Sequence, residues 1–62
     1  MKNKVAVFRK DARLSQEELA KIIGITRTYL SEIERGKKVP GADIAKFLCI
    51  VLEVPFEVLF CA

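Results

Sequence analysis

Two short helices joined across a glycine turn are the feature that most restricts how this chain can fold. Ser15 and Glu18 form an S-x-x-E capping box, in which each side chain accepts a backbone N–H of the other residue, so a helix begins after Ser15. About two turns later, Gly24 offers the left-handed backbone conformation that commonly ends a helix. Thr26 is a second N-cap and Gly36 a second stop. The segment therefore predicts two helices separated by a very short turn.

The rest of the chain is divided by glycine and proline into three further helices, with no strand pattern. We expect one helix at residues 4–12, one at residues 42–52 and a short one at residues 55–60. The helix that follows Thr26 is expected at about residues 26–35. The prediction is an all-α fold, a compact bundle of five short helices in which the second and third form a helix-turn-helix.

Residues 1–62 are expected to form a single domain of this kind. The net charge of +3 and the pI near 9.1 are compatible with a polyanionic partner. There is no histidine, and Cys49 and Cys61 are too few for a zinc site, so we expect no metal and no cofactor. The sequence contains no nucleophile–base pair, no paired carboxylates in a plausible cleft and no phosphate-binding loop, so we expect that the protein is not an enzyme. No small-molecule ligand is evident. The sequence has no signal-peptide core and no apolar run long enough to span a membrane. We therefore expect a cytoplasmic protein that does not bind membranes and whose thiols are reduced.

The helix pair resembles the DNA-binding domain of the lambda-repressor-like (XRE) family of bacterial and phage regulators. The resemblance covers nearly the whole chain and depends on small and apolar residues in register with the capping box: Leu19, Ala20, Gly24, Ile25, Leu30 and Ile33. We expect the buried side of the helix after Ser15 to consist of Leu19, Ala20, Ile22 and Ile23. The resemblance implies that the helix at residues 26–35 enters the major groove of DNA by its N-terminal end.

Four polar residues on the outward face of that helix are candidates for reading bases: Arg27, Thr28, Ser31 and Glu32. Arg27 can donate two hydrogen bonds to O6 and N7 of guanine, which discriminates by roughly 1–3 kcal/mol. Thr28 can contact a thymine methyl group, and Glu32 can accept from N4 of cytosine. For Glu32 a solvated surface position is an equal alternative, because a carboxylate repels phosphate.

The affinity for DNA is expected to come from contacts to the DNA phosphates. By resemblance, Gln16 at the start of the second helix binds a phosphate, and Tyr29, Lys37 and Lys38 lie where family members hold the DNA backbone. Arg13 is a further candidate, at a position where the family often has glycine, and a left-handed backbone there would be strained. A solubilising loop is the alternative for the two lysines.

The resemblance also implies a structural ion pair. Arg9 and Glu34 match positions where an arginine of the first helix meets a glutamate near the end of the third. Such a pair would hold the reading helix against the rest of the domain.

The last third of the chain carries more apolar side chains than a small core can bury. Ile44, Leu48, Val51 and Leu52 can fill the core, and Cys49 is expected to be buried with them. The surplus predicts an exposed dimer interface at Phe47, Ile50, Val54, Val58 and Phe60. An over-packed core or a missing covering segment is the alternative. Glu53 replaces a glycine that often ends the fourth helix, which leaves the backbone of that turn open.

These features predict a sequence-specific DNA-binding regulator of transcription, and a repressor rather than an activator. We expect a chain of this length to have no room for a sensing domain, so it would repress by occupying a promoter or act under the control of a partner. A homodimer would place two reading helices about 34 Å apart on a pseudo-palindromic operator. The competing interpretation is a protein-interaction module that keeps the scaffold and binds a protein through its apolar C-terminal helices without reading DNA.

Overall fold

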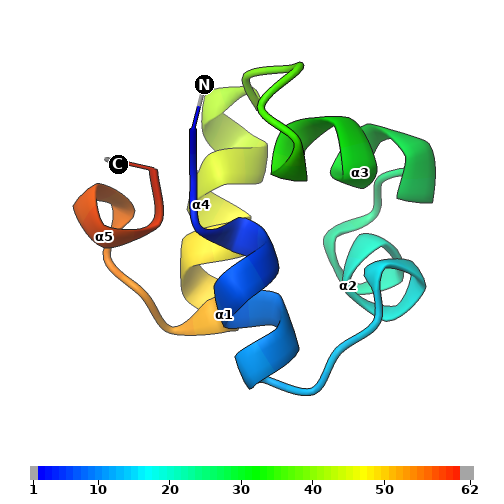
Figure 1. The fold of residues 1–62 in the computed structure, drawn as a ribbon, viewed down its shortest axis with the longest axis horizontal. Helices are drawn as coiled ribbons and strands as arrows, with labels where there is room; N and C mark the ends of the chain where they lie inside the picture. Colours follow the sequence, from blue (N-terminus) through cyan, green and yellow to red (C-terminus); the bar gives the residue numbers. More distant parts are fainter. Residues whose placement is uncertain (1, 61–62) are drawn as a thin grey trace.

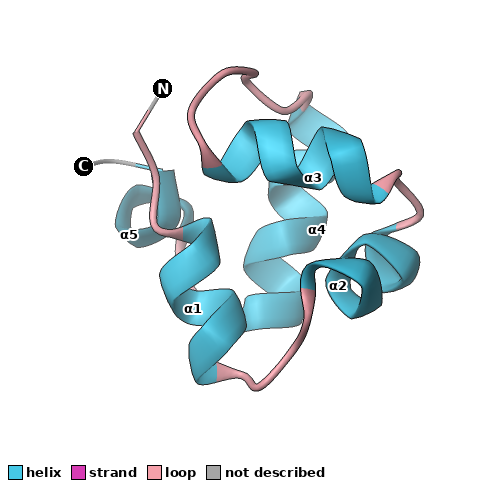
Figure 2. Ribbon diagram, turned by 45° about the vertical axis from the view of Figure 1, so that its right-hand side comes forward, coloured by secondary structure: helices cyan, strands magenta, loops and turns pink. Residues whose placement is uncertain are grey.

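The fold is a bundle of five short helices (Figure 1). The computed structural model describes residues 2–60, and within them the chain forms five helices and no strand. The helices are α1 (Val5–Asp11), α2 (Gln16–Ile23), α3 (Arg27–Glu34), α4 (Ala42–Leu52) and α5 (Phe56–Phe60). Helix α4 packs on α1, α2 and α5, while α3 packs on α2 and α1 (Figure 2). The predicted all-α fold is confirmed.

The turn between α2 and α3 forms as the sequence predicted. Ser15 Oγ accepts from the Glu18 N–H at 3.0 Å, and Glu18 Oε1 accepts from the Ser15 N–H at 2.9 Å. Gly24 has a φ of 87°, and a Cβ added to it would meet no atom within 4 Å. Glycine is therefore favoured there by the backbone angle and not by a lack of space for a side chain. Thr26 Oγ1 then accepts from the Tyr29 N–H at 3.0 Å and caps α3.

Each of the first four helices ends in the same way, with a left-handed residue whose successor donates its N–H to the carbonyl five residues earlier. These hydrogen bonds measure between 2.9 and 3.1 Å. The left-handed residues are Arg13, Gly24, Gly36 and Glu53, with φ values of 61°, 87°, 75° and 56°. Arg13 and Glu53 carry a Cβ that crowds the following carbonyl in this conformation, so both positions are strained.

The core draws on all five helices. Its fully buried large side chains are Leu19, Leu30, Ile33, Leu48, Leu59 and Val5. From α2 the buried residues are Leu19, Ala20 and Ile23, and the expectation that Ile22 is buried with them was wrong, because its side chain is 57% exposed. Only a narrow face of α2 packs against α3 and α4, and Ile22 lies outside that face.

The expected exposure of Val54 and Phe60 was also wrong, since these side chains are only 8% and 4% exposed. The reason is that α5 folds back onto α1 and α4, where the Leu59 carbonyl accepts from the Lys4 N–H at 2.8 Å. The rings of Phe56 and Phe60 also pack together, with centroids 5.1 Å apart. Exposed apolar side chains do remain on α4 and α5, at Phe47, Ile50, Phe56 and Val58.

Cys49 lies on α4, partly buried against the core. Burial raises the pKa of its thiol, and the nearby Glu57 carboxylate raises it further. A raised pKa keeps the thiol protonated and less reactive. Cys61 lies outside the described residues.

Glu53→Gly should stabilise the domain, because glycine adopts the left-handed conformation without the strain of a Cβ. We expect the free energy of unfolding in urea to rise by about 0.5–1 kcal/mol. Glu53→Ala is the matched control, since it removes the carboxylate and keeps the Cβ. An equal gain in both variants would show that charge, and not backbone strain, is being relieved.

Glu18→Gln should destabilise the domain at neutral pH and matter less in acid. Hydrogen bonds from the backbone and side chain of Ser15 lower the pKa of Glu18. A lowered folded-state pKa gives stability that is fully present above the ordinary glutamate pKa and is lost as the pH falls through the folded value. Urea unfolding at a series of pH values should therefore show the advantage of the wild type shrinking in acid. A difference that is independent of pH would contradict this role for the carboxylate.

Candidate nucleic-acid interface

Polar side chains from α2 and α3 surround a shallow depression of about 170 Å³ on the surface of the domain. Its lining residues are Gln16, Arg27, Thr28 and Ser31. Gln16 is the first residue of α2, and the other three come from the first two turns of α3. The structure thus brings three of the four candidate base-reading residues next to the candidate phosphate ligand of α2.

Next to this depression, the carboxylate of Glu34 on α3 accepts hydrogen bonds from side chains of α1 and α2. Glu34 Oε2 accepts from Arg9 Nε at 2.7 Å, and Glu34 Oε1 accepts from Arg9 Nη2 at 3.3 Å. Arg9 Nη1 also donates to the Leu14 carbonyl at 2.8 Å. The side chains of Arg9 and Glu34 are only 10% and 6% exposed, so water screens the pair weakly. The pair ties α3 to α1 and to the loop ahead of α2.

Gln16 takes part in the same network. Its Nε2 donates to Glu34 Oε1 at 3.0 Å, which directs the amide toward α3. A primary amide has two N–H donors, so one remains for a ligand in the depression. The contact with Glu34 therefore fixes the side chain that is expected to meet a phosphate.

Glu32 lies outside the residues that line the depression. Its Oε1 is 3.8 Å from Lys38 Nζ, at a partly exposed surface position. The backbone N–H groups of Lys37 and Lys38 also donate to the Glu32 carbonyl, at 2.9 and 3.3 Å. Glu32 thus contacts the loop that follows α3, and its carboxylate is partly neutralised by Lys38.

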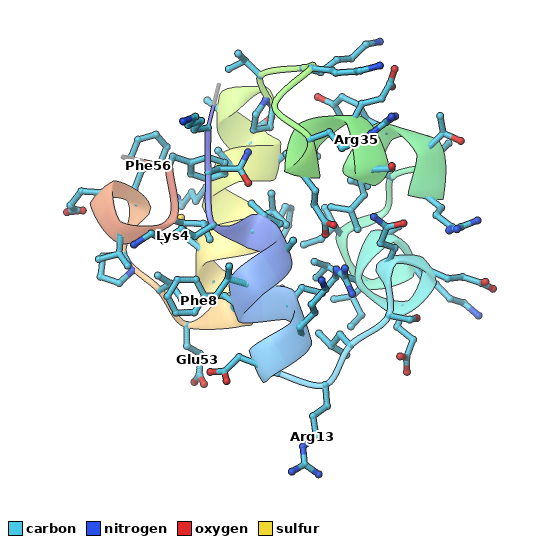
Figure 3. All side chains as sticks on the ribbon, in the orientation of Figure 1. Lys4, Phe8, Arg13, Arg35, Glu53 and Phe56 are labelled. Atoms are coloured by element: carbon cyan, nitrogen blue, oxygen red, sulfur yellow. The ribbon has the colours of Figure 1, made fainter. Side chains whose placement is uncertain are left out.

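The remaining candidates for phosphate contacts occupy different surroundings. Lys37 and Lys38 are exposed in the loop after α3, whereas Tyr29 is half-buried and packs against the core. Arg13 projects into solvent from the loop between α1 and α2, well away from α3 (Figure 3). The structure therefore does not bring Arg13 to the depression.

Two residues near α3 were not indicated by the sequence patterns. Asn3 Nδ2 donates to the Ile33 carbonyl at 2.8 Å, and Asn3 Oδ1 accepts from the Val5 N–H at 3.0 Å, so one side chain joins the start of α1 to the end of α3. An asparagine two residues before a helix is the signal that could have revealed it. Arg35 adds an exposed cation at the end of α3 (Figure 3).

Residues 2–60 contain no group of three or more His, Cys, Asp or Glu side chains that could hold a metal ion. In the same part of the chain, no helix has the length and hydrophobicity needed to cross a bilayer.

A glycine turn between two packed helices, with exposed polar side chains on the second, defines a helix-turn-helix domain of the DNA-binding kind. The sequence model of the Helix-turn-helix family matches residues 6–59. The chain therefore belongs to the lambda-repressor-like (XRE) helix-turn-helix family, and its similarity to HTH-type transcriptional regulators points to a DNA-binding regulator and not to an enzyme.

Several known proteins are similar to this chain. The ImmF control region 10 kDa protein of Bacillus phage phi105 is 39% identical over 51 residues, which cover 82% of this chain and 57% of the phage protein. The HTH-type transcriptional regulator YgzD of Bacillus subtilis is 37% identical over 60 residues, covering 97% of this chain and 91% of YgzD. An HTH-type transcriptional regulator of Mycobacterium tuberculosis is 38% identical over 52 residues, covering 84% of this chain and 37% of the regulator. The chain thus spans less than two thirds of the phage and mycobacterial proteins.

Glu34→Ala should be strongly destabilising, because it leaves the buried Arg9 guanidinium without its counter-ion. Breaking a buried pair on one side costs about 3–5 kcal/mol, which we expect to see in urea unfolding. Glu57→Ala is the control, since it removes an exposed glutamate and should change stability by about 0.5 kcal/mol or less. A loss of under about 1 kcal/mol for Glu34→Ala would mean that the pair behaves like an exposed one.

Proposed function

We propose that this protein is a sequence-specific repressor of transcription that binds a pseudo-palindromic operator as a homodimer. The observation that carries the proposal is the depression formed by Gln16 of α2 and by Arg27, Thr28 and Ser31 of α3. In a helix-turn-helix, the N-terminal end of the second helix meets base edges while the first helix crosses the DNA backbone. The lining residues supply a group for each task.

Base reading is assigned first to Arg27, which is exposed at the first position of α3. Its guanidinium can bind O6 and N7 of guanine together, and Thr28 beside it can contact a thymine methyl group. Ser31 can donate to or accept from a base one turn further along. Glu32 can accept from cytosine N4, and the adjacent Lys38 reduces its repulsion from the phosphates.

Phosphate binding is assigned to groups that flank the reading residues. Gln16 offers its free N–H donor at the start of α2, and the exposed Lys37 and Lys38 offer cations after α3. Tyr29 can reach the backbone only through its hydroxyl group, since its ring packs against the core. Arg13 is the weakest candidate, because it lies away from α3 and could contact a phosphate only if the DNA extended beyond the end of α1.

The homodimer is supported by size and by the exposed apolar side chains of α4 and α5. The longest dimension of the domain is 24 Å, which is shorter than one turn of DNA of about 34 Å. A domain of this size covers one half-site, so two copies would bind an operator with two half-sites one turn apart. Phe47, Ile50 and Val58 remain exposed for such an interface, whereas Val54 and Phe60 are part of the monomer core.

Repression requires only that the protein occupy DNA that RNA polymerase needs, and it needs no further domain. Binding to duplex DNA would place this activity in the cytoplasm.

The same exposed apolar side chains support a second candidate, a protein-interaction module that does not read DNA. The buried position of Glu34 counts against it, because only Glu32 is left to make the surface of α3 acidic.

Selection from a randomised pool of duplex DNA at two salt concentrations tests the function, with Arg27→Ala and Lys37→Ala as a matched pair. Arg27→Ala should relax the preference for one base by roughly 1–3 kcal/mol. Lys37→Ala should weaken binding to all sequences alike and reduce the slope of log K against log salt by about 0.9. If no sequence is enriched and binding is insensitive to salt, the protein-interaction module becomes the better proposal.

A further inference from the structure

A stripe of four exposed side chains runs along α4, on a surface that the helix-turn-helix does not use. Asp43, Lys46, Phe47 and Ile50 recur at spacings of three and four residues and line an open groove of about 390 Å³. Phe47 and Ile50 are 52% and 60% exposed, and the lining is more apolar than polar. Apolar side chains gathered on one helix face indicate a surface that another molecule covers.

The charges on this stripe suit a second copy of the same chain. Asp43 and Lys46 lie one helical turn apart, and neither belongs to the two ion pairs found within residues 2–60. If two α4 helices pack antiparallel about a two-fold axis between residues 44 and 45, Asp43 lies opposite the partner's Lys46 and Lys46 opposite the partner's Asp43. A two-fold interface must be complementary to itself, and this pair of charges meets that condition.

The same register also covers apolar surface. It brings Ile50 toward the residues just ahead of the partner's α4, where Val39 is 64% exposed. Phe47 then lies over the small side chain at Ala42 of the partner. The apolar contacts would thus flank the charged pairs, which lie next to the axis.

The other exposed apolar surface, on α5, lacks this property. Between Phe56 and Val58 it carries Glu57 and no cation, so two α5 helices that faced each other would bring like charges together. Phe60, which would enlarge the surface, is buried beneath Phe56. Charge therefore favours α4 over α5 as the face that meets a second copy.

We propose that the α4 stripe is the homodimer interface, and that Asp43 and Lys46 select a second copy of this chain by pairing across the two-fold axis. The inference rests on the proposed function for the existence of a dimer and names the surface and the residues that choose the partner. The apolar contacts supply affinity, while the charges exclude chains that present a like charge at either position.

Charge reversal tests the proposal through the oligomeric state in sedimentation equilibrium, measured without DNA. D43K and K46D each place like charges across the axis, so each alone should dissociate at least about tenfold more readily than the wild type. An equimolar mixture of the two restores both opposite pairs and should form a heterodimer as tight as the wild-type dimer. E57K on α5 is the control and should leave the homodimer unchanged. Circular dichroism checks that each variant folds.

Three results would overturn the interface: a wild-type protein that stays monomeric at millimolar concentration, single variants that dimerise normally, or a dimer broken by E57K. Rescue by mixing cannot arise from misfolding, because neither chain is repaired by the other. The test is separate from DNA binding. A wild-type dimer that selects no DNA sequence would contradict the proposed function and leave the interface standing, whereas a monomer that selects a sequence would contradict the interface alone.

Discussion

The buried ion pair between Arg9 and Glu34 is the interaction on which the arrangement of the reading helix depends. A charge in so dry a position is tolerated only when its hydrogen-bonding capacity is used, and here Leu14 and Gln16 complete it. The pair therefore does more than hold α3 against α1. Because Gln16 contacts the same carboxylate, the groups proposed to meet phosphate and those proposed to meet bases are placed by one network.

Local signals in the sequence were sufficient for most of the fold. The capping box at Ser15 and Glu18, the glycine at position 24 and the cap at Thr26 act within a few residues, so their geometry follows from residue types alone. The bounds of α4 followed equally well from the residues that flank it. The strained turns at Arg13 and Glu53 were suggested only by the glycines that the family often has there, because nothing local compels a residue with a Cβ to adopt the left-handed conformation.

Apart from the exposure of Ile22, the errors and omissions share a cause, which is contact between segments distant in sequence. Val54 and Phe60 are buried because α5 returns to the start of the chain, where its Leu59 carbonyl accepts from Lys4. No periodicity in α5 reveals that return. The role of Asn3 and the sharing of Glu34 by Gln16 likewise depend on how helices meet in space. The grouping of Arg27, Thr28 and Ser31 could be predicted, since one helix face displays them.

The hydrogen bonds of Asn3 with Ile33 and Val5 also determine where the start of the chain enters the domain. Asn3 lies within hydrogen-bonding distance of the Ile33 carbonyl, at the C-terminal end of the reading helix. Lys2 is therefore an exposed cation close to the end of the helix that is proposed to enter the major groove. If α3 enters the major groove as proposed, an affinity tag or a fused protein placed ahead of Asn3 would emerge at the C-terminal end of that helix, where its own charge would add to or oppose the attraction of the phosphates.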